Sequence, residues 1–543
     1  MSRRRIDLVV RGAIVLAARP GGLETAEAIG IAGSRVVSAG SAAEVLTEAP
    51  GARLVDAGDA AVIPGLHDFH IHLAALARSR RGVQLDDARD AGEIADRLRR
   101  AVEAQPEGWI TGRGWSEAQL AGGVELLEAA VAGRPAFLTS HDGHSAWASA
   151  VARGLAELDT ATADPPGGRI ERYGHGEPIG ILREMALNFV APLVTRLQGD
   201  ALRASLAETL TELAALGITG ASEAGDYTDE NGIGADAAFG DSFSTLTDLG
   251  DLIDGRLRLN LGIPADALSA AAARGLRTGA ALDRRETMRF GWAKEYADGA
   301  LGSGTAALFE PRSCADGGTG ILRVSRDQLD DLFRRARPAG IGLAIHAIGD
   351  RAAAEVLDAV GRAEPRASAV PSDRIEHAQL LRRADAARLG ALGRVASIQP
   401  IHAAADRDLA DACWEGRDRL GGAYAWRRLA DGGALLAAGS DAPVESFNPW
   451  LGVFAAVHRR FPADDRADWR ADQALSLAEA LSAYTLGPAS AIGASDEGHL
   501  HPGARADLAV LSVGIEDLQR GDDALGEVRA QLTLVGGREV FAA

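Results

Sequence analysis

Two histidines separated by one residue, His70 and His72, stand in the segment PGLHDFHIHL at residues 64–73. The apolar residues around them predict a strand, in which alternate side chains point to the same face. Both imidazoles would then face one way, close enough to bind a single metal ion. Such a pair also occurs among ordinary surface histidines, so it needs further ligands before it indicates a metal site.

Lys294 is the only lysine in the chain, although lysine and arginine together number 57. Arginine is always protonated, whereas a lysine amine can lose its proton and act as a nucleophile. Lys294 lies in RFGWAKEYADGALG, which predicts a buried strand that runs into a glycine-rich loop. Because a surface cation is poorly suited to such a strand, we expect this lysine to take part in chemistry.

Three more residues of metal-ligand type stand where apolar runs give way to loops. They are His346 in IGLAIHA, His377 in DRIEHAQ and Asp441 after LLAAGS. Taken singly, each histidine could be a hydrogen-bonded core residue, and Asp441 could cap a following helix. Taken with Lys294 and the histidine pair, they form a set that suits zinc or a similar divalent ion.

The elements that must position these residues are eight apolar runs separated by alanine-rich helical stretches, the pattern of parallel βα units. The runs are AVIPGLHDFHIH, GITGASEA, RLRLNLGI, MRFGWAKEYA, IGLAIHA, DRIEHAQ, RVASIQP and ALLAAGSDAP. They predict an α/β fold with a (β/α)8 barrel, whose reactive groups lie at the C-terminal strand ends. A doubly wound open sheet would require a phosphate-binding glycine motif. The nearest candidate, Gly232 with Gly234, follows no predicted strand and is better explained as a loop.

Both chain ends carry short strand-like runs separated by turn signals. We therefore expect one small β domain from residues 1–62 and 500–543, beside a barrel of residues 63–499. The first two predicted barrel strands are separated by roughly 140 residues, far more than a usual βα connection. Residues from about 80 to 200 are therefore expected to form a helical and irregular subdomain inserted over the barrel mouth.

The order of these residues, together with several local strings, resembles the metal-dependent amidohydrolase superfamily. The strings WITGRGW, SHDGHSAW, KEYADGALGSGTAAL, AIHAIGDRA, RIEHAQ, SIQPIH, GSDAPV and GHLHPGARADLAVL are similar to those of its YtcJ-like branch. That branch, amidohydrolase family 3, is related to N-substituted formamide deformylase. The resemblance covers nearly the whole chain and implies a distorted (β/α)8 TIM barrel beside a β-sandwich-like domain formed by both termini.

The resemblance also implies a binuclear centre, with two Zn²⁺ ions per chain as the expected cofactors. In the family pattern the lysine is carboxylated by CO2 and bridges the two ions. Asp441 would also act as general acid and base, while a metal-bound hydroxide attacks the carbonyl. Carried onto this sequence, one ion would be held by His70, His72 and Asp441, the other by His346 and His377, with carboxylated Lys294 between them.

A second set of residues is expected to contact the substrate. Gln399 and His402 end the seventh predicted strand at the barrel mouth. Trp292 and Tyr296 alternate with Lys294, so they either form an aromatic wall or fill a barrel layer.

Three further positions have more than one interpretation each. Asp298 follows the lysine strand closely and could contact substrate, orient a ligand imidazole or cap a loop. Trp115 and His144 lie in the insertion and either line the substrate pocket or pack within that subdomain. Two departures from the family pattern are His67, expected to face away from the ligand pair, and Gly304, where relatives commonly have arginine.

These features predict an enzyme that hydrolyses a non-peptide carbon–nitrogen bond in a linear amide of the N-acyl or N-formyl amine type. The alternative is a carbon–oxygen hydrolase, such as a lactonase or a carbamate or ester hydrolase, because the same centre serves both and the loops select the leaving group. A non-catalytic scaffold would be expected to have lost ligands, and the sequence keeps all six.

Composition restricts the partners. The net charge of -19 disfavours nucleic acid, and no apolar run is long enough to cross a bilayer. Cys314 and Cys413 are the only cysteines and lie far apart in sequence, so we expect no disulfide and a cytoplasmic location. The expected partners are a small-molecule substrate and a second copy of the chain in a homodimer.

Overall fold

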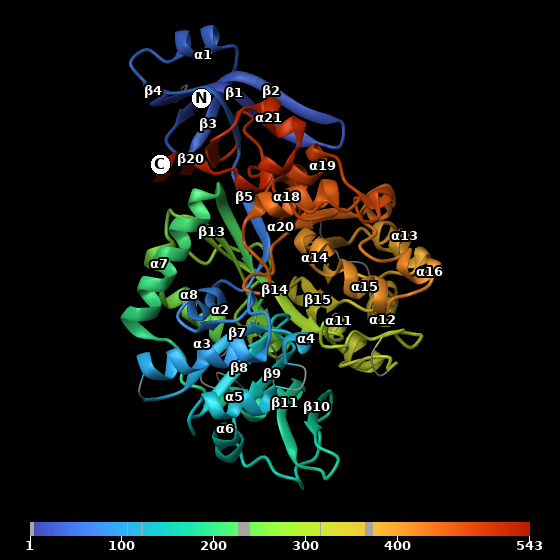
Figure 1. Cartoon of the computed structure of the whole chain (residues 1–543). Coiled ribbons are helices and arrows are strands. Elements are labelled where there is room, and N and C mark those ends of the chain that lie inside the picture. Colours follow the sequence, from blue (N-terminus) through green and yellow to red (C-terminus); the bar gives the residue numbers. More distant parts are fainter. Residues whose placement is uncertain (1–4, 106, 121–122, 226–238, 315–316, 364–372) are drawn as a thin grey trace.

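Eight parallel strands form the central sheet of the computed structural model, which describes residues 5–543 except 106, 121–122, 226–238, 315–316 and 364–372. Their order in the sheet is β18-β17-β16-β15-β14-β13-β12-β5. Figure 1 labels β5, β13, β14 and β15 of this sheet in the middle of the molecule. The strands are β5 (Leu66–Ile71), β12 (Ile218–Glu223), β13 (Arg258–Pro264), β14 (Met288–Tyr296), β15 (Leu343–Ala347), β16 (Arg374–His377), β17 (Val395–Ile398) and β18 (Leu435–Ala438). Seven of them lie within the predicted runs, and β13 extends one residue beyond its run, to Pro264.

The sheet curves round until the end of β18 meets β5. There the backbone N–H of Asp441 donates to the carbonyl of His70 (2.7 Å), and the N–H of His72 donates to that of Ala442 (2.8 Å). Three of the six predicted ligand residues therefore make the seam of the barrel. The predicted barrel fold is confirmed.

Helices cover the outside of the barrel. Helix α11 shows the local causes: Ser325 and Gln328 form a capping box at its start, and Gly340 ends it with a left-handed φ of 68°. Its buried face, which includes Leu329 and Phe333, packs toward the sheet. The helices that follow barrel strands include α2 (Leu73–Ser79), α7 (Gly199–Ala215), α8 (Asp241–Asp248), α9 (Gly250–Ile253), α10 (Leu268–Ala273), α11 (Arg326–Ala339), α12 (Asp350–Arg362), α13 (Arg383–Ala391), α14 (Pro400–Ala405), α15 (Arg407–Cys413), α16 (Arg417–Leu420), α17 (Trp426–Asp431), α18 (Pro449–His458), α19 (Leu477–Ala483) and α20 (Leu486–Ile492).

A second sheet combines both ends of the chain, in the order β21-β20-β19-β4-β1-β2-β3. Its members are β1 (Leu8–Arg19), β2 (Gly22–Ala32), β3 (Arg35–Gly40), β4 (Arg53–Pro64), β19 (Leu508–Leu511), β20 (Ala530–Val535) and β21 (Arg538–Ala542), with α1 (Ala42–Glu48) and α21 (Ile515–Arg520) beside them. The two ends join where β19 pairs antiparallel with β4. The predicted extra domain of terminal strands is confirmed, and Figure 1 shows it at the opposite end of the molecule from the insertion.

The insertion between β5 and β12 is built on a six-stranded sheet, so the expected helical and irregular subdomain is wrong in this respect. Its strands, in sheet order, are β10 (Gly168–Arg172), β11 (Pro178–Glu184), β9 (Ser145–Ala148), β8 (Ala136–Ser140), β7 (Ile110–Trp115) and β6 (Val83–Gln84); α3 (Ala91–Ala104), α4 (Glu117–Leu120), α5 (Val124–Ala130) and α6 (Ala150–Leu155) accompany them. These strands have at most seven residues, and β7 contains two glycines. Such short runs show too little alternation to be recognised as strands.

Two other expectations can be compared with the fold. Gly232 and Gly234 lie outside the described residues, so the loop expected there has no structural description. Among the helices that the structure describes, none has both the length and the apolar character needed to span a bilayer.

Cys314 and Cys413 form a disulfide, so the expectation of two unpaired cysteines is wrong. Cys314 lies in the loop after β14, and Cys413 ends α15, which follows β17. Both elements follow C-terminal strand ends, and the two Cα atoms are 4.5 Å apart although 99 positions separate them in sequence. The cysteine argument for a reducing cytoplasm therefore loses its basis, and a cytoplasmic location stays a prediction.

Reduction of this disulfide is expected to destabilise the fold by about 2–4 kcal/mol, because a bond that closes a long loop restricts the unfolded chain. Thermal unfolding with and without dithiothreitol measures the effect. The C314S/C413S variant is the control, since it should unfold at the lower temperature in both conditions. An identical melting temperature for the oxidised protein, the reduced protein and the variant would contradict the prediction.

Candidate metal centre and active site

The six predicted ligand residues meet at the C-terminal end of the barrel. His70 lies in β5 with His72 immediately after it, while Lys294, His346 and His377 lie in β14, β15 and β16. Asp441 follows β18. His377 and Asp441 have left-handed backbones, with φ of 68° and 61°. Few residues other than glycine adopt this conformation, although Asp and His adopt it more readily than most, and such residues cluster at active sites.

The side chains converge as a metal site requires. Asp441 Oδ1 lies 3.3 Å from His70 Nε2 and 3.3 Å from His72 Nε2. The ring centroids of His346 and His377 are 4.5 Å apart, and those of His70 and His377 are 5.2 Å apart. Donor atoms of His70, His377 and Asp441 all lie within 4.8 Å of one another, close enough to bind one ion.

Four nitrogen atoms of this set are buried without a hydrogen-bond partner among the described residues: His70 Nε2, Lys294 Nζ, His346 Nε2 and His377 Nδ1. A buried polar atom with no partner costs free energy, so four in one place indicate that something else binds them. A divalent ion suits them, because neutral imidazoles and carboxylates are its usual ligands. The residues present therefore fit the metal that the sequence predicts.

Lys294 is buried at this point, with only 1% of its surface exposed. Burial lowers the pKa of its amine to about 8, although the Glu376 and Asp441 carboxylates oppose this shift. A lysine with a lowered pKa is more often unprotonated, which is the state that reacts with CO2 or binds a metal.

Glu376 supports His70 from the side opposite to the cavity. Its Oε2 accepts from His70 Nδ1 at 2.5 Å, and its other oxygen pairs with Arg374. Arg374 is itself held between the rings of Phe69 and Trp292, 4.4 Å from each centroid. An acceptor on Nδ1 leaves Nε2 of His70 to face the site. The sequence analysis missed Glu376, although two charges alternating in the short strand RIEH were a signal.

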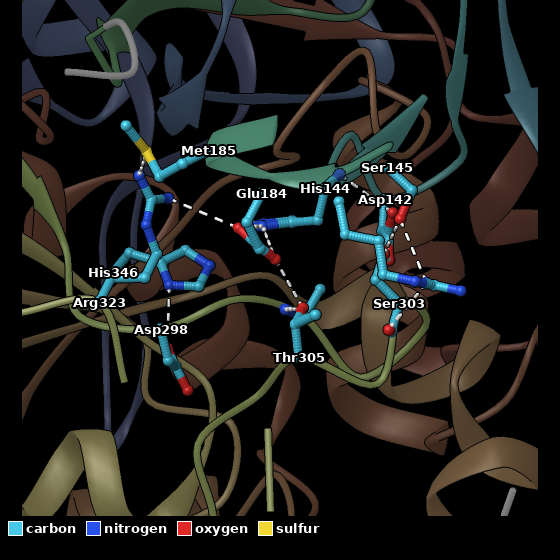
Figure 2. Close-up of polar contacts among 12 residues, drawn as sticks. Asp142, His144, Ser145, Glu184, Met185, Asp298, Ser303, Thr305, Arg323 and His346 are labelled. Atoms are coloured by element: carbon cyan, nitrogen blue, oxygen red, sulfur yellow. Dashed lines mark hydrogen bonds and ion pairs between the residues drawn. The ribbon is translucent and has the colours of Figure 1, made fainter. Parts of the chain in front are cut away.

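Asp298 supports His346 in the same way, since its Oδ1 lies 3.2 Å from His346 Nδ1 (Figure 2). The carboxylate also accepts backbone N–H groups of Ala307, Ile348 and Gly349. Burial raises the pKa of Asp298 to about 7, and these backbone donors act in the opposite direction. Asp298 is fully buried, so the structure places it behind a ligand imidazole rather than on the substrate side.

Asp441 is the carboxylate of the set that also lines the cavity. Burial disfavours its charge, but His70, His402 and His72 hold the pKa of Asp441 well below its usual range. His402 Nε2 lies 3.2 Å from Asp441 Oδ2. Burial opposes protonation of His402, yet its contact with Asp441 raises the pKa of this imidazole to about 8. Asp441 and His402 therefore form a pair that can hold and pass a proton.

A cavity of about 660 Å³ opens above the metal site, between the barrel mouth and the insertion. His377 and Asp441 line it, as do three of the predicted substrate-contact residues, Trp115, His144 and His402. Two residues of the barrel loops that the sequence did not single out, Asp406 and Glu445, also line the cavity. This is the size of cavity that small-molecule ligands occupy in proteins.

The other four predicted contact residues are not among those that line this cavity. Trp292 packs against Phe69 and Arg374 inside the barrel, and the ring centroid of Tyr296 lies 4.7 Å from Lys294 Nζ. Gln399 lies 3.2 Å from His70 Nδ1, and Asp298 lies behind His346. Tyr296, Gln399 and Asp298 therefore contact predicted ligands, whereas Trp292 packs in the barrel interior.

His67 faces away from the ligand pair, as its spacing predicts. Its Nε2 lies 2.9 Å from Ser222 Oγ, and burial lowers the pKa of this imidazole to about 3. At Gly304, the guanidinium of Arg312 lies 2.7 Å from where a Cβ would stand. An arginine from eight residues further along the loop therefore occupies the space beside this glycine.

A comparison of the sequence with protein families agrees with this geometry. The family described as "Amidohydrolase family" matches residues 53–541, and the chain belongs to it. It is therefore a metal-dependent hydrolase that acts on carbon–nitrogen bonds.

Individual relatives cover most of the chain. It is 31% identical to Protein LONG AFTER FAR-RED 3 of Arabidopsis thaliana, over 88% of this chain and 82% of that protein. It is 29% identical to N-substituted formamide deformylase of Arthrobacter pascens, over 94% of each chain, which confirms the predicted branch. An uncharacterized metal-dependent hydrolase from Pyrococcus horikoshii OT3 has a similar structure, with a TM-score of 0.71, 26% identity, and 92% of this chain and 96% of that one covered.

Replacing Glu376 by glutamine is expected to weaken metal binding about 10–100-fold, because the loss of a carboxylate behind a ligand histidine has effects of this size. Competition with a chelator of known affinity measures the change. Glu497→Gln is the control, since Glu497 is a buried glutamate paired with Arg289 outside the site. Equal metal affinity in the two variants and the wild type would show that Glu376 does not support His70.

Proposed function

We propose that the protein hydrolyses a linear amide of the N-acyl or N-formyl amine type at a centre of two Zn²⁺ ions bridged by carboxylated Lys294. The observation that carries this proposal is the group of four buried nitrogen atoms that have no hydrogen-bond partner among the described residues, directly below a cavity of about 660 Å³. Membership of the amidohydrolase family and the relative named N-substituted formamide deformylase support the reaction type.

Following the family pattern, His70, His72 and Asp441 would hold one ion and His346 and His377 the other, with Lys294 between them. Donor atoms of His70, His377 and Asp441 lie close together, as two neighbouring ions would require. When bound, such ions acidify water and polarise a carbonyl oxygen. Lys294 suits the bridge because its buried amine has a lowered pKa, and an amine that has reacted with CO2 offers two carboxylate oxygens. No arginine can form this group.

Hydrolysis needs a proton to move from the attacking water to the leaving nitrogen, and Asp441 is placed to carry it. Its carboxylate lines the cavity and lies 3.2 Å from His402 Nε2. The water oxygen bonds to the carbonyl carbon while Asp441 takes a water proton. The carbon–nitrogen bond then breaks as Asp441 returns the proton to the amine.

The cavity suits a substrate with a sizeable group on one side of the amide. A formyl group alone would fill little of about 660 Å³, so the substituent occupies the rest. The lining is mixed, with Leu301, Ile348 and Val444 beside several charged residues.

A homodimer also remains a prediction.

Loss of Lys294 tests the bridge. Lys294→Ala and Lys294→Arg are both expected to lose bound metal and to reduce kcat/KM by more than about 100-fold, because a direct ligand matters more than the residues behind it. Acetate or propionate added to Lys294→Ala should restore part of the activity, because the missing group is a carboxylate. Metal quantification and steady-state rates measure both effects. Full metal content and activity in both variants would refute the bridge.

Matched substrates test which type of bond the enzyme cleaves. Amides and esters of the same acid, with leaving groups of the same shape, are compared by kcat/KM in the metal-loaded wild type. The proposal predicts that the amides are hydrolysed and that N-acyl and N-formyl amines are the best of them. A clear preference for lactones, carbamates or esters with no amide turnover would identify a carbon–oxygen hydrolase instead.

A further inference from the structure

The insertion is fastened to the barrel loop that follows the lysine strand. Ser303 Oγ donates to Asp142 Oδ2 (2.6 Å) and lies 3.1 Å from Ser145 Oγ. Thr305 Oγ1 donates to Glu184 Oε1 at 2.6 Å. Figure 2 shows these contacts between the strands of the insertion and the loop below them. The insertion is therefore a fixed wall of the active site at this point.

One imidazole of this wall, His144, lies over the metal ligands. Its ring centroid is 5.2 Å from that of His346, and it lines the cavity. Its Nδ1 lies 3.1 Å from both carboxylate oxygens of Glu184. The exposed fractions of the two side chains are 7% and 0%. Because Nδ1 faces a carboxylate, it carries the proton of that bond, and the opposite edge of the ring with Nε2 is turned away from Glu184.

Glu184 has a strained backbone, and this strain argues that its contact with His144 is not incidental. Glu184 has a left-handed φ of 51°, an unfavourable conformation for a residue of its size. Gly299 leaves the necessary room, since a Cβ there would lie 2.0 Å from Glu184 Oε1. Arg323 Nη1 lies 3.6 Å from the other oxygen. The carboxylate is therefore held by Thr305 and Arg323 as well as by its contact with His144.

We propose that His144 is a catalytic residue contributed by the insertion, which hydrogen-bonds through Nε2 to the scissile amide, and that Glu184 is its positioning residue. The proposal rests on the proposed function, because it assumes an amide bound over the centre. Because Glu184 fixes the imidazole of His144, the ring can hold the scissile amide without changing its own orientation during the reaction. Docking of the insertion needs no such imidazole, because Asp142, Ser145 and Ser303 already provide the contacts.

Substitutions that distinguish the role of His144 Nε2 from that of Nδ1 test the proposal. Asparagine places its amide nitrogen near Nδ1, whereas glutamine reaches the position of Nε2. His144→Ala and His144→Asn are expected to lower kcat by about 100-fold with a smaller change in KM, the effect of losing one preorganised hydrogen bond in the transition state. His144→Gln should restore part of the loss. His175→Ala is the control, because His175 is an exposed histidine of the insertion.

Glu184→Gln tests the positioning. It is expected to lower kcat in the wild type but to have little further effect in His144→Ala, because Glu184 acts through His144. Melting temperature and metal content are measured for every variant, and these should stay close to the wild type. Additive losses in the double variant, or recovery by asparagine rather than glutamine, would show a structural role and overturn the proposal.

A second readout does not depend on turnover. In protein labelled with ¹⁵N-histidine, the hydrogen-bonded Nδ1–H of His144 should give a downfield resonance that disappears in His144→Ala and shifts in Glu184→Gln. If that resonance is absent from the wild type or persists in His144→Ala, the inference fails whatever the activity. If the resonance behaves as expected but the wild type cleaves neither amides nor esters, the proposed function fails while the positioning by Glu184 stands.

Discussion

The arrangement of the barrel mouth depends on four nitrogen atoms that are removed from water and given no hydrogen-bond partner among the described residues. A folded protein does not normally tolerate such a group, because each unpaired buried donor or acceptor costs about 1–3 kcal/mol. Bound cations remove this cost and replace it with strong interactions. We therefore expect metal binding to stabilise this end of the barrel as well as to supply its chemistry.

Residues around the ligands serve to keep those nitrogens pointed inward. Glu376 and Asp298 each occupy the Nδ1 side of a ligand histidine, and both are fully buried. Asp68 accepts backbone N–H groups of His70 and Ser440, so it ties the first strand to the loop that carries Asp441. The same seam closes the barrel, which explains why the left-handed backbone of Asp441 is maintained. Fold closure and ligand geometry depend on the same contacts.

The sequence predicted the barrel well because its strands are short apolar runs, most of which carry a chemically distinctive residue at or near their end. Lys294 was recognisable as the only lysine. The supporting carboxylates were harder to find, since Glu376 and Asp68 become meaningful only when strands distant in sequence are adjacent. The insertion's sheet was missed because strands such as Ser145–Ala148 are too short to show alternation. The Cys314–Cys413 disulfide was missed because sequence separation says little about distance between two barrel loops.

The most direct test of the account is anomalous X-ray diffraction from crystals of the zinc-loaded protein, with data collected on both sides of the zinc absorption edge. The account predicts two anomalous peaks among His70, His72, His346, His377 and Asp441, joined by additional density on the side chain of Lys294. A single peak or none at this position, with an unmodified Lys294 amine directed away from it, would contradict the account.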